Sequence, residues 1–264
     1  TVPPTEKGKY RAIASGAISN GKPVVVNSAG TVSVVNASDQ TVGSEAVFES
    51  AETTWVNATF DSSNNKIVIS YLDAGNSNYG TAIVATIDSS DNSVSYGSPV
   101  VFNSASTNQG KITFDSSNNK VVIAYNNGGD SGHGYAIVGT VSGTSISFGS
   151  AAEFENAVIS DPAITFDSSN NKVVIAYRDE GNSNYGTAIV GTVSGTSISF
   201  GSAAVYESAN ASETGMAFDS SNNKVLICYQ DGGDNDEGVA RVGTISGTSI
   251  SYGTATKFNT NDPT

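Results

Sequence analysis

The sequence predicts an all-β protein, and more closely a five-bladed β-propeller of four-stranded antiparallel blades. Two repeated motifs carry this prediction. The string FDSSNNK begins at Phe60, Phe114, Phe166 and Phe218, in steps of 54, 52 and 52 residues. The string G-(S/T)-x-x-x-(F/Y) occurs five times, beginning at Gly43, Gly97, Gly149, Gly201 and Gly253. No segment has the 3.6-residue apolar period of an amphipathic helix, because Gly and Ser interrupt every candidate.

Each regular repeat predicts four strands. In the repeat that begins near Phe114 they are expected at Ile112–Asp115, Lys120–Tyr125, Tyr135–Val141 and Ser145–Phe154. The first two strands flank the turn Ser-Ser-Asn-Asn, and small polar residues between two β-branched runs are typical of a hairpin.

Side-chain size alternates along the second strand of a repeat. Ile69 and Tyr71 are expected on one face, and the smaller Val68 and Ser70 on the other. Large side chains of one blade can then pack against small side chains of the next, as stacked sheets require. A linear β-solenoid is the alternative architecture, although its repeats are usually shorter.

The whole chain, residues 1–264, is predicted to form one propeller. The regular blades are expected at residues 51–104, 105–156, 157–208 and 209–260, and a diverged first blade at residues 6–50. The diverged blade is inferred because the motif at Gly43 has no FDSSNNK before it; its strands are expected at Tyr10–Ile18, Lys22–Asn27 and Thr31–Asn36. In the alternative organisation, residues 1–42 form a separate anchoring segment and the remainder is a four-bladed ring.

Composition excludes some classes of function. Charged residues make up 14% of the chain and sum to a net charge of −13, so a nucleic-acid partner is not expected, because phosphate binding depends on basic side chains. No run of 18 apolar residues occurs, so membrane insertion is not expected. The single cysteine, Cys228, aligns with Ser70, Ala124 and Ala176 in the other repeats, and is interpreted as a small buried residue.

Comparison of the repeats predicts one constant and one variable face. The FDSSNNK turns and the Ser-Gly-Thr turns lie on one side of the disc and hardly change. The crossovers between blades and the turns between the second and third strands lie on the other side and do change. Binding residues are concentrated in loops carried by a rigid scaffold, so we expect a ligand on the variable face.

The turn between the second and third strands carries most of the candidate binding residues. Its oxygen atoms could hold a calcium ion, or form a polar cup for a sugar beside an aromatic ring; alternatively, Asp, Asn and Gly only shape the turn. Apart from this possible calcium no cofactor is expected, and no metal ligand is assigned. The candidates in the four repeats are Asp73, Asn76, Asn78, Tyr79, Asn127, Asp130, His133, Asp179, Asn182, Asn184, Tyr185, Asp231, Asp234 and Asp236.

Trp55 is a further candidate, because an exposed indole in a crossover could stack on a sugar or a protein; alternatively it is a wedge between blades. His133 is the only histidine, so no Ser/His/Asp or Cys/His catalytic set and no zinc site can be assembled. The loop carboxylates Asp179 and Glu180 could serve a glycosidase, but loop carboxylates are ordinarily solvated. No catalytic residue is therefore assigned, and the chain is not expected to be an enzyme.

The tandem YRDEGNSNYGTAIVGTVSGTSISFGSAAVYES, together with FDSSNNKVVIAY, resembles the propeller-like repeats of virion and tail-fibre-like proteins of marine bacteriophages. The resemblance covers residues 43–260. The opening GAISNGKPVVVNSAGTVSVV is similar to β-rich segments that precede such repeats in phage structural proteins. The resemblance implies a location on a virion surface or outside the cell, and it supplies no catalytic residues.

The function expected from the sequence is a non-enzymatic binding module on a virion. It would recognise a host-surface glycan or protein through the variable face, contact other virion proteins, and gain avidity from several weak sites. One alternative is a structural decoration or fibre subunit of a virion or filament. The second alternative is a secreted propeller enzyme that acts on polysaccharide.

Overall fold

The computed structural model describes residues 13–18, 24–34 and 45–259. Contacts divide the chain into two compact units, Thr1–Ser44 and Glu45–Thr264. The described residues form twenty strands and three short 3-10 helices, and no α-helix occurs among them. The prediction of an all-β chain is confirmed.

The described part of the first unit is a small three-stranded sheet. Strand β3 (Thr31–Val34) pairs in parallel with β1 (Ile13–Ala14) and antiparallel with β2 (Val24–Val26). The turn between β2 and β3 contains Gly30 at φ +75°, where glycine carries no steric penalty. The Gly43 motif and much of the expected diverged blade lie outside the described residues, so the fifth blade stays a prediction.

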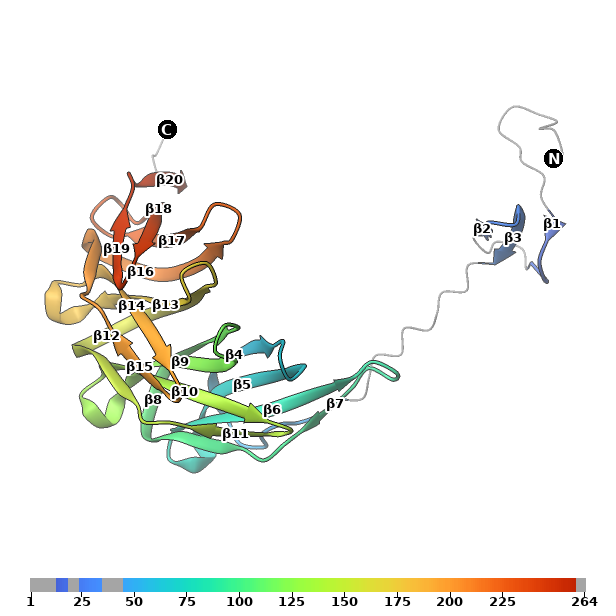
Figure 1. Cartoon of the computed structure of the whole chain (residues 1–264), viewed down its shortest axis with the longest axis horizontal. Coiled ribbons are helices and arrows are strands. Elements are labelled where there is room, and N and C mark those ends of the chain that lie inside the picture. The colour runs from blue at the N-terminus through green and yellow to red at the C-terminus, as the bar shows by residue number, and fades with distance from the viewer. Residues whose placement is uncertain (1–12, 19–23, 35–44, 260–264) are drawn as a thin grey trace. The chain divides into compact units, whose positions relative to one another are not determined.

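The second unit contains four successive repeats (Figure 1). The bounds of their strands and 3-10 helices are β4 (Thr53–Asp61), β5 (Lys66–Asp73), η1 (Ala74–Asn76), β6 (Tyr79–Asp88), β7 (Ser93–Tyr96), β8 (Val100–Asp115), β9 (Lys120–Asn127), η2 (Gly128–Asp130), β10 (His133–Ser142), β11 (Ser145–Phe148), β12 (Ala152–Asp167), β13 (Lys172–Asp179), η3 (Glu180–Asn182), β14 (Tyr185–Ser194), β15 (Ser197–Phe200), β16 (Ala204–Asp219), β17 (Lys224–Asp231), β18 (Glu237–Ser246), β19 (Ser249–Tyr252) and β20 (Thr256–Asn259). All strand pairs in this unit are antiparallel, and the fold is propeller-like.

Three strands pass from one blade into the next. The first part of β12 pairs with β10, through Ala152 and Ala136, and its last part pairs with β13, through Ala163 and Ala176. Strands β8 and β16 do the same. The crossovers that the sequence suggested were variable loops are therefore extended strand, and that expectation is wrong. The single strand expected at Ser145–Phe154 is also wrong, because it is split into β11 and the start of β12.

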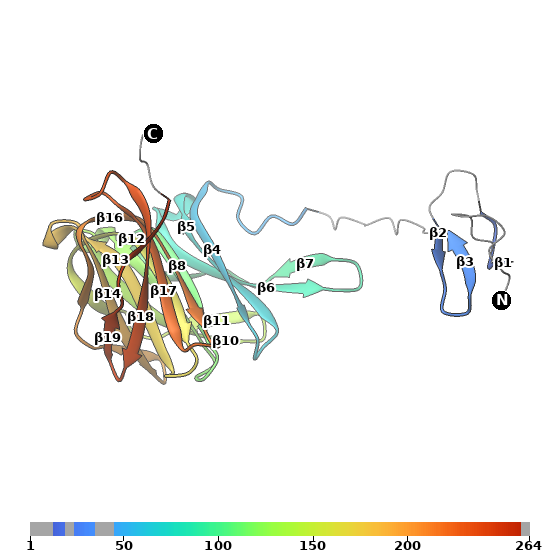
Figure 2. The same cartoon turned by 90° about the horizontal axis from the view of Figure 1, so that it is seen from above.

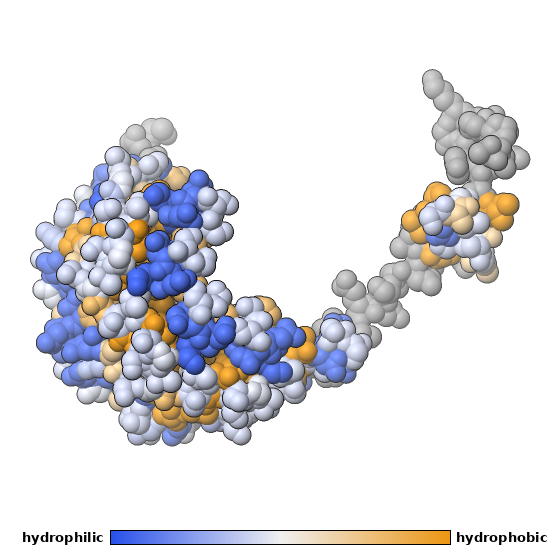
Figure 3. Space-filling model, viewed as in Figure 1, coloured by the Kyte–Doolittle hydropathy of each residue, from blue (hydrophilic) through white to orange (hydrophobic). Residues whose placement is uncertain are grey.

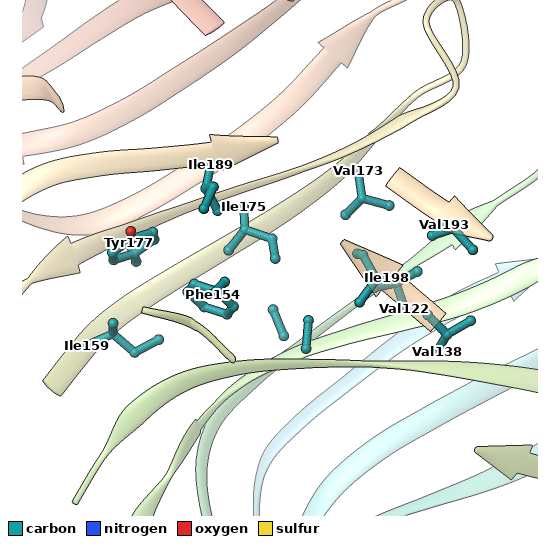
Figure 4. Packing of buried hydrophobic residues seen from close by; sticks show 12 residues of the cluster. Val122, Val138, Phe154, Ile159, Val173, Ile175, Tyr177, Ile189, Val193 and Ile198 are labelled. Atoms are coloured by element: carbon teal, nitrogen blue, oxygen red, sulfur yellow. The ribbon is translucent and has the colours of Figure 1, made fainter. Parts of the chain in front are cut away.

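The core consists of apolar clusters between neighbouring blades. Figure 4 shows the cluster in which Val122 and Val138 lie opposite Val173 and Ile175 of the following blade, with Phe154 among them. These three valines and the isoleucine are fully buried. The predicted pairing of small side chains with the large side chains of the next blade is confirmed. Outside this core, polar residues dominate the visible face of the second unit, with apolar patches between them (Figure 3).

The FDSSNNK turns close the outer end of each inner hairpin and also tie the blades together. Asp167 is 1% exposed, and its carboxylate accepts hydrogen bonds from the backbone N–H groups of Ser169 and Asn170 and from the Asn170 side chain, at 2.9, 3.0 and 2.8 Å. In the same turn, the Ser169 hydroxyl donates to the Asn223 side chain of the next blade at 2.5 Å. The turn is repeated in sequence because its Asp, second Ser and Asn side chains have structural partners.

Candidate functional site

Four residues occupy one equivalent bulged position in strands β4, β8, β12 and β16, in the part of each strand that pairs with the second strand of its blade. They are Trp55, Gln109, Asp161 and Glu213, with φ angles of +53°, +52°, +49° and +51°. The strand register shifts at each of them. A left-handed conformation at a residue other than glycine costs roughly 1 to 3 kcal/mol, and a β-bulge turns a side chain out of the regular alternation. The backbone of all four blades is therefore specialised at this one level.

These four side chains line one pocket. Lys111, Pro162 and Thr214 complete its wall, and the pocket has a volume of about 260 Å³. Each of the four inner strands contributes at least one residue. A second pocket, of about 210 Å³, is lined further along the same strands by Asn57, Lys111, Ile112, Ala163, Ile164, Thr214, Gly215 and Met216. The pocket at the bulged residues is the candidate functional site.

Asp161 is held in place by one residue of the preceding blade and one of its own blade. Its backbone N–H donates to Gln109 Oε1 at 2.6 Å, and its Oδ2 lies 3.5 Å from Arg178 Nη1. Arg178 is fixed in turn, because its Nε donates to the Ser160 hydroxyl at 2.7 Å and its Nη2 lies 3.4 Å from Glu180 Oε1. The carboxylate of Asp161 is thus oriented by a partly buried cation at the edge of the pocket.

Glu213 has a different setting. Its side chain is exposed, and no hydrogen bond or ion pair to it occurs among the described residues. Trp55 is 47% exposed and presents its indole to the same pocket. One oriented carboxylate, one free carboxylate and one aromatic ring therefore share a pocket that also contains the cation Lys111.

Tyrosines behind the pocket are kept protonated. Burial raises the pKa of Tyr206, and the charge of Asp161 raises it further, although a hydrogen bond with Thr214 acts in the opposite direction. Burial also raises the pKa of Glu155, whose Oε2 accepts a hydrogen bond from the Tyr177 hydroxyl at 2.8 Å. The hydroxyls of Tyr177 and Tyr206 therefore stay neutral beside the charged residues of the pocket.

The predicted turn residues mostly shape their own loops. The side chains of Asp73, Asn127 and Asp179 cap the helices η1, η2 and η3, and accept backbone N–H groups at 3.1, 3.1 and 3.0 Å. Asp231 accepts the N–H of Gly233 at 2.9 Å in the fourth repeat. Burial raises the pKa of Asp179 and of Asp231. These contacts support the interpretation in which Asp and Asn form the turn.

Backbone carbonyl groups in these turns accept hydrogen bonds from the strand that crosses to the next blade. Asn78 and Asn184 have φ angles of +61° and +62°, and their carbonyl groups accept the N–H groups of Thr107 and Ala211 at 3.0 and 3.1 Å. Asp236 has the same left-handed conformation, with φ +59°. Asn76 and Asn182 end the helices η1 and η3, and each donates its N–H to the capping carboxylate.

The remaining predicted residues lie at the start of the third strands or beside them. Tyr79, His133 and Tyr185 are the first residues of β6, β10 and β14. His133 Nδ1 lies 2.9 Å from Glu153 Oε1 and 3.7 Å from Asp130 Oδ2. Asp130 also accepts the Tyr135 hydroxyl at 2.7 Å.

In the fourth repeat, Asp234 Oδ2 lies 2.5 Å from Lys257 Nζ. Of the predicted candidates, Trp55 is the one that lines the pocket at the bulged residues.

Gln109, Asp161 and Glu213 were missed in the sequence. Aligning the repeats would have found them: they lie 54, 106 and 158 residues after Trp55, and the later FDSSNNK motifs lie at the same distances from the first. Only Asp161 is of a type that turns favour, and Trp55, Gln109 and Glu213 are not, so propensity does not predict a left-handed backbone in all four repeats.

Comparison with known proteins gives a distant structural match. No family model matches the sequence, and no curated protein matches it either. Among solved structures, the chain is similar to an exo-β-1,3-galactanase from Phanerochaete chrysosporium in complex with β-1,3-galactotriose, with 10% sequence identity and a TM-score of 0.50. The match covers 90% of this chain and 53% of that chain, so this chain spans about half the length of the enzyme.

This match corrects two expectations. The chain was expected to be a non-enzymatic virion binding module, with a structural subunit as the first alternative, and it was expected not to be an enzyme. A solved structure with a similar fold is an exo-β-1,3-galactanase, and this finding contradicts both expectations. No comparison links the chain to bacteriophage virions, so that resemblance and the surface location stay predictions. No helix in the described part of the chain is long and apolar enough to cross a membrane.

Proposed function

We propose that the second unit is a glycoside hydrolase that acts on a polysaccharide in the pocket at Trp55, Asp161 and Glu213. The observation that carries this proposal is the presence of two carboxylates in the same pocket as an exposed indole. Glycoside hydrolysis ordinarily needs two carboxyl groups on either side of the scissile bond, and aromatic rings suit the apolar faces of sugars. The fold likeness to a galactanase supports the same chemistry.

The two carboxyl groups have different roles in this proposal. Glu213, which has no partner among the described residues, donates the proton to the leaving glycosidic oxygen. Asp161, oriented by Arg178 at 3.5 Å, acts on the anomeric carbon directly or through a water molecule. Trp55 positions a sugar ring by stacking on it, and Lys111 offers a hydrogen-bond donor to a sugar hydroxyl.

The test is hydrolysis of a panel of polysaccharides, with β-1,3-galactan included because of the structural match. New reducing ends and the chromatographic profile of the products report turnover. Asp161→Asn and Glu213→Gln should each lower turnover by about 10² to 10⁴-fold, the contribution of a positioned acid or base. Glu153→Gln is the matched control, because that carboxylate contacts His133 and does not line the pocket.

Unchanged melting temperatures for the three variants would show that the loss is not caused by unfolding. Absence of turnover on every polysaccharide, or full activity in both pocket variants, contradicts the proposal.

A further inference from the structure

The joints between neighbouring blades of the second unit are all built from the same two faces. In the joint between the last two blades, the preceding blade contributes the small side chains of Val174 and Val190. The following blade contributes larger side chains such as Ile245 and Ile250. We call these the leading face and the receiving face. The other two joints repeat this arrangement.

Among the described residues, nothing covers the leading face of the last blade. Leu226 and Val242 occupy the positions of Val174 and Val190 in the preceding blade. Leu226 is 39% exposed and Val242 is 41% exposed, whereas Val174 and Val190 are both 0% exposed. The side chains that are buried in every internal joint are therefore open to solvent at this end.

Within the described part of the second unit, the receiving face of the first regular blade is also without a covering blade. Ile87 occupies the position of Val141, Val193 and Ile245. Ile87 is 58% exposed, whereas each of the three equivalent side chains is 7% exposed. Phe60, on the inner strand of the same blade, is 51% exposed. Exposed apolar clusters of this kind commonly mark contact surfaces.

We propose that the leading face of one copy of this chain packs on the receiving face of a second copy. The two faces are complementary because near-identical faces already meet in the three internal joints. They do not cover each other within one copy: the inner strands β4 and β8 are in extensive contact, and β4 makes no comparable contact with β16. Each copy carries one face of each kind, so the contact is head-to-tail.

Two local differences make this joint weaker than an internal one. In internal joints an aromatic side chain of the leading blade packs on a tyrosine of the next, as Phe154 packs on Tyr177 with ring centroids 5.2 Å apart. On the receiving face, Phe48 of the same copy already packs on Tyr71, with ring centroids 5.2 Å apart. Phe258 of the incoming copy therefore cannot pack on this tyrosine.

The second difference is the turn between β6 and β7. In the internal joint between the first two regular blades, the equivalent turn of the second blade packs tightly on the first: a Cβ added to Gly97 would lie 1.8 Å from the Thr144 carbonyl oxygen. The first regular blade instead carries a longer turn with Asp88 and Asp91, and Figure 2 shows its β6–β7 hairpin extending beyond the neighbouring strands. The joint between copies is thus looser, and we expect the association to depend on concentration.

The test uses the full chain in sedimentation velocity over a wide range of concentration. The wild-type chain should associate as its concentration rises. Leu226→Asp and Ile87→Asp should each remain monomeric, because a carboxylate in a desolvated apolar contact is strongly unfavourable. Val205→Asp is the matched control: Val205 is 41% exposed in an internal blade and lies on neither uncovered face, so association should be unchanged. Phe258→Ser should also leave it unchanged.

Mixing the two aspartate variants separates a lost contact from a misfolded chain. The Leu226→Asp variant keeps an intact receiving face, and the Ile87→Asp variant keeps an intact leading face. An equimolar mixture should therefore form pairs and nothing larger.

A mixture that stays monomeric, or a wild-type chain that is monomeric at every concentration, overturns the proposal. A monomeric wild type whose melting temperature falls with Leu226→Asp would also overturn it, since another segment of the same chain would then cover this face.

Discussion

The two ends of the inner strands differ in what is repeated from blade to blade. At the FDSSNNK end the side chains are identical, and Asp61, Asp115 and Asp167 are each 1% exposed. At the other end the backbone is identical and the side chains differ: Trp55, Gln109, Asp161 and Glu213 share a bulge and a positive φ. In this protein, side chains that are the same in every blade stabilise the fold. The pocket is lined where the backbone conformation is the same in every blade but the side chains differ.

The titration of carboxylates differs between the same two regions. On the FDSSNNK side, hydrogen bonds from Ser90 lower the pKa of Asp88, and hydrogen bonds from Asn222 lower the pKa of Asp219. On the pocket side, burial raises the pKa of Glu155. Hydrogen bonds thus favour the charged form of Asp88 and Asp219, whereas burial disfavours the charged form of Glu155.

The largest expected effect comes from breaking the scaffold end. Asp167→Ala removes a buried acceptor of three hydrogen bonds, which should lower the free energy of unfolding by about 3 kcal/mol. Asp161→Asn, at the pocket end, should change it by less than about 1 kcal/mol. Urea denaturation measures both. Equal losses in the two variants would contradict the division into a scaffold end and a pocket end.

A smaller effect is expected from pH. The folded-state pKa of Glu155 is raised above its ordinary value of 4.5, so the folded chain holds this proton more tightly than the unfolded chain. The stability that this group contributes is complete below its unfolded pKa and is lost as pH rises through the folded pKa. Glu155→Gln should therefore raise stability at neutral pH relative to the wild type and flatten this part of the pH profile. An unchanged profile of urea midpoints against pH would show that burial of Glu155 does not affect its titration.

The smallest expected effect concerns the bulge itself. Glu213→Gly should stabilise the fold by up to about 1 kcal/mol, because glycine adopts φ +51° without a steric penalty. Glu213→Val should destabilise it, because a β-branched residue fits this conformation poorly. Thermal unfolding measures both variants. If both substitutions shift the midpoint in the same direction, the left-handed backbone at residue 213 is not strained.

The repeats made most of the fold predictable. The 3.6-residue period is missing, FDSSNNK recurs, and small and large residues alternate along Val173–Tyr177, so strands, turns and inter-blade packing followed from local rules. The continuous strands β8, β12 and β16 did not follow, because their crossover residues are polar and are paired by strands of two successive repeats. The N–H of Thr107, for example, donates to the carbonyl group of Asn78 at 3.0 Å.

The pocket was predictable only in part. Trp55 attracted attention as the single tryptophan. Gln109, Asp161 and Glu213 were not found, since their importance depends on a bulge that brings four strands together at one level. A bulge of this kind has no composition signal when its residues are neither Gly nor Asn.

The most direct test of a glycan-binding pocket at the bulged residues uses the fluorescence of Trp55, the only tryptophan of the chain. The Asp161→Asn variant, which should bind a glycan without cleaving it, is titrated with oligosaccharides of the polysaccharide that the wild type hydrolyses. We expect a saturable change in emission as a sugar ring stacks on the indole. An emission spectrum that stays constant while the variant binds the same oligosaccharide, measured by calorimetry, would place the glycan site elsewhere and contradict the proposal.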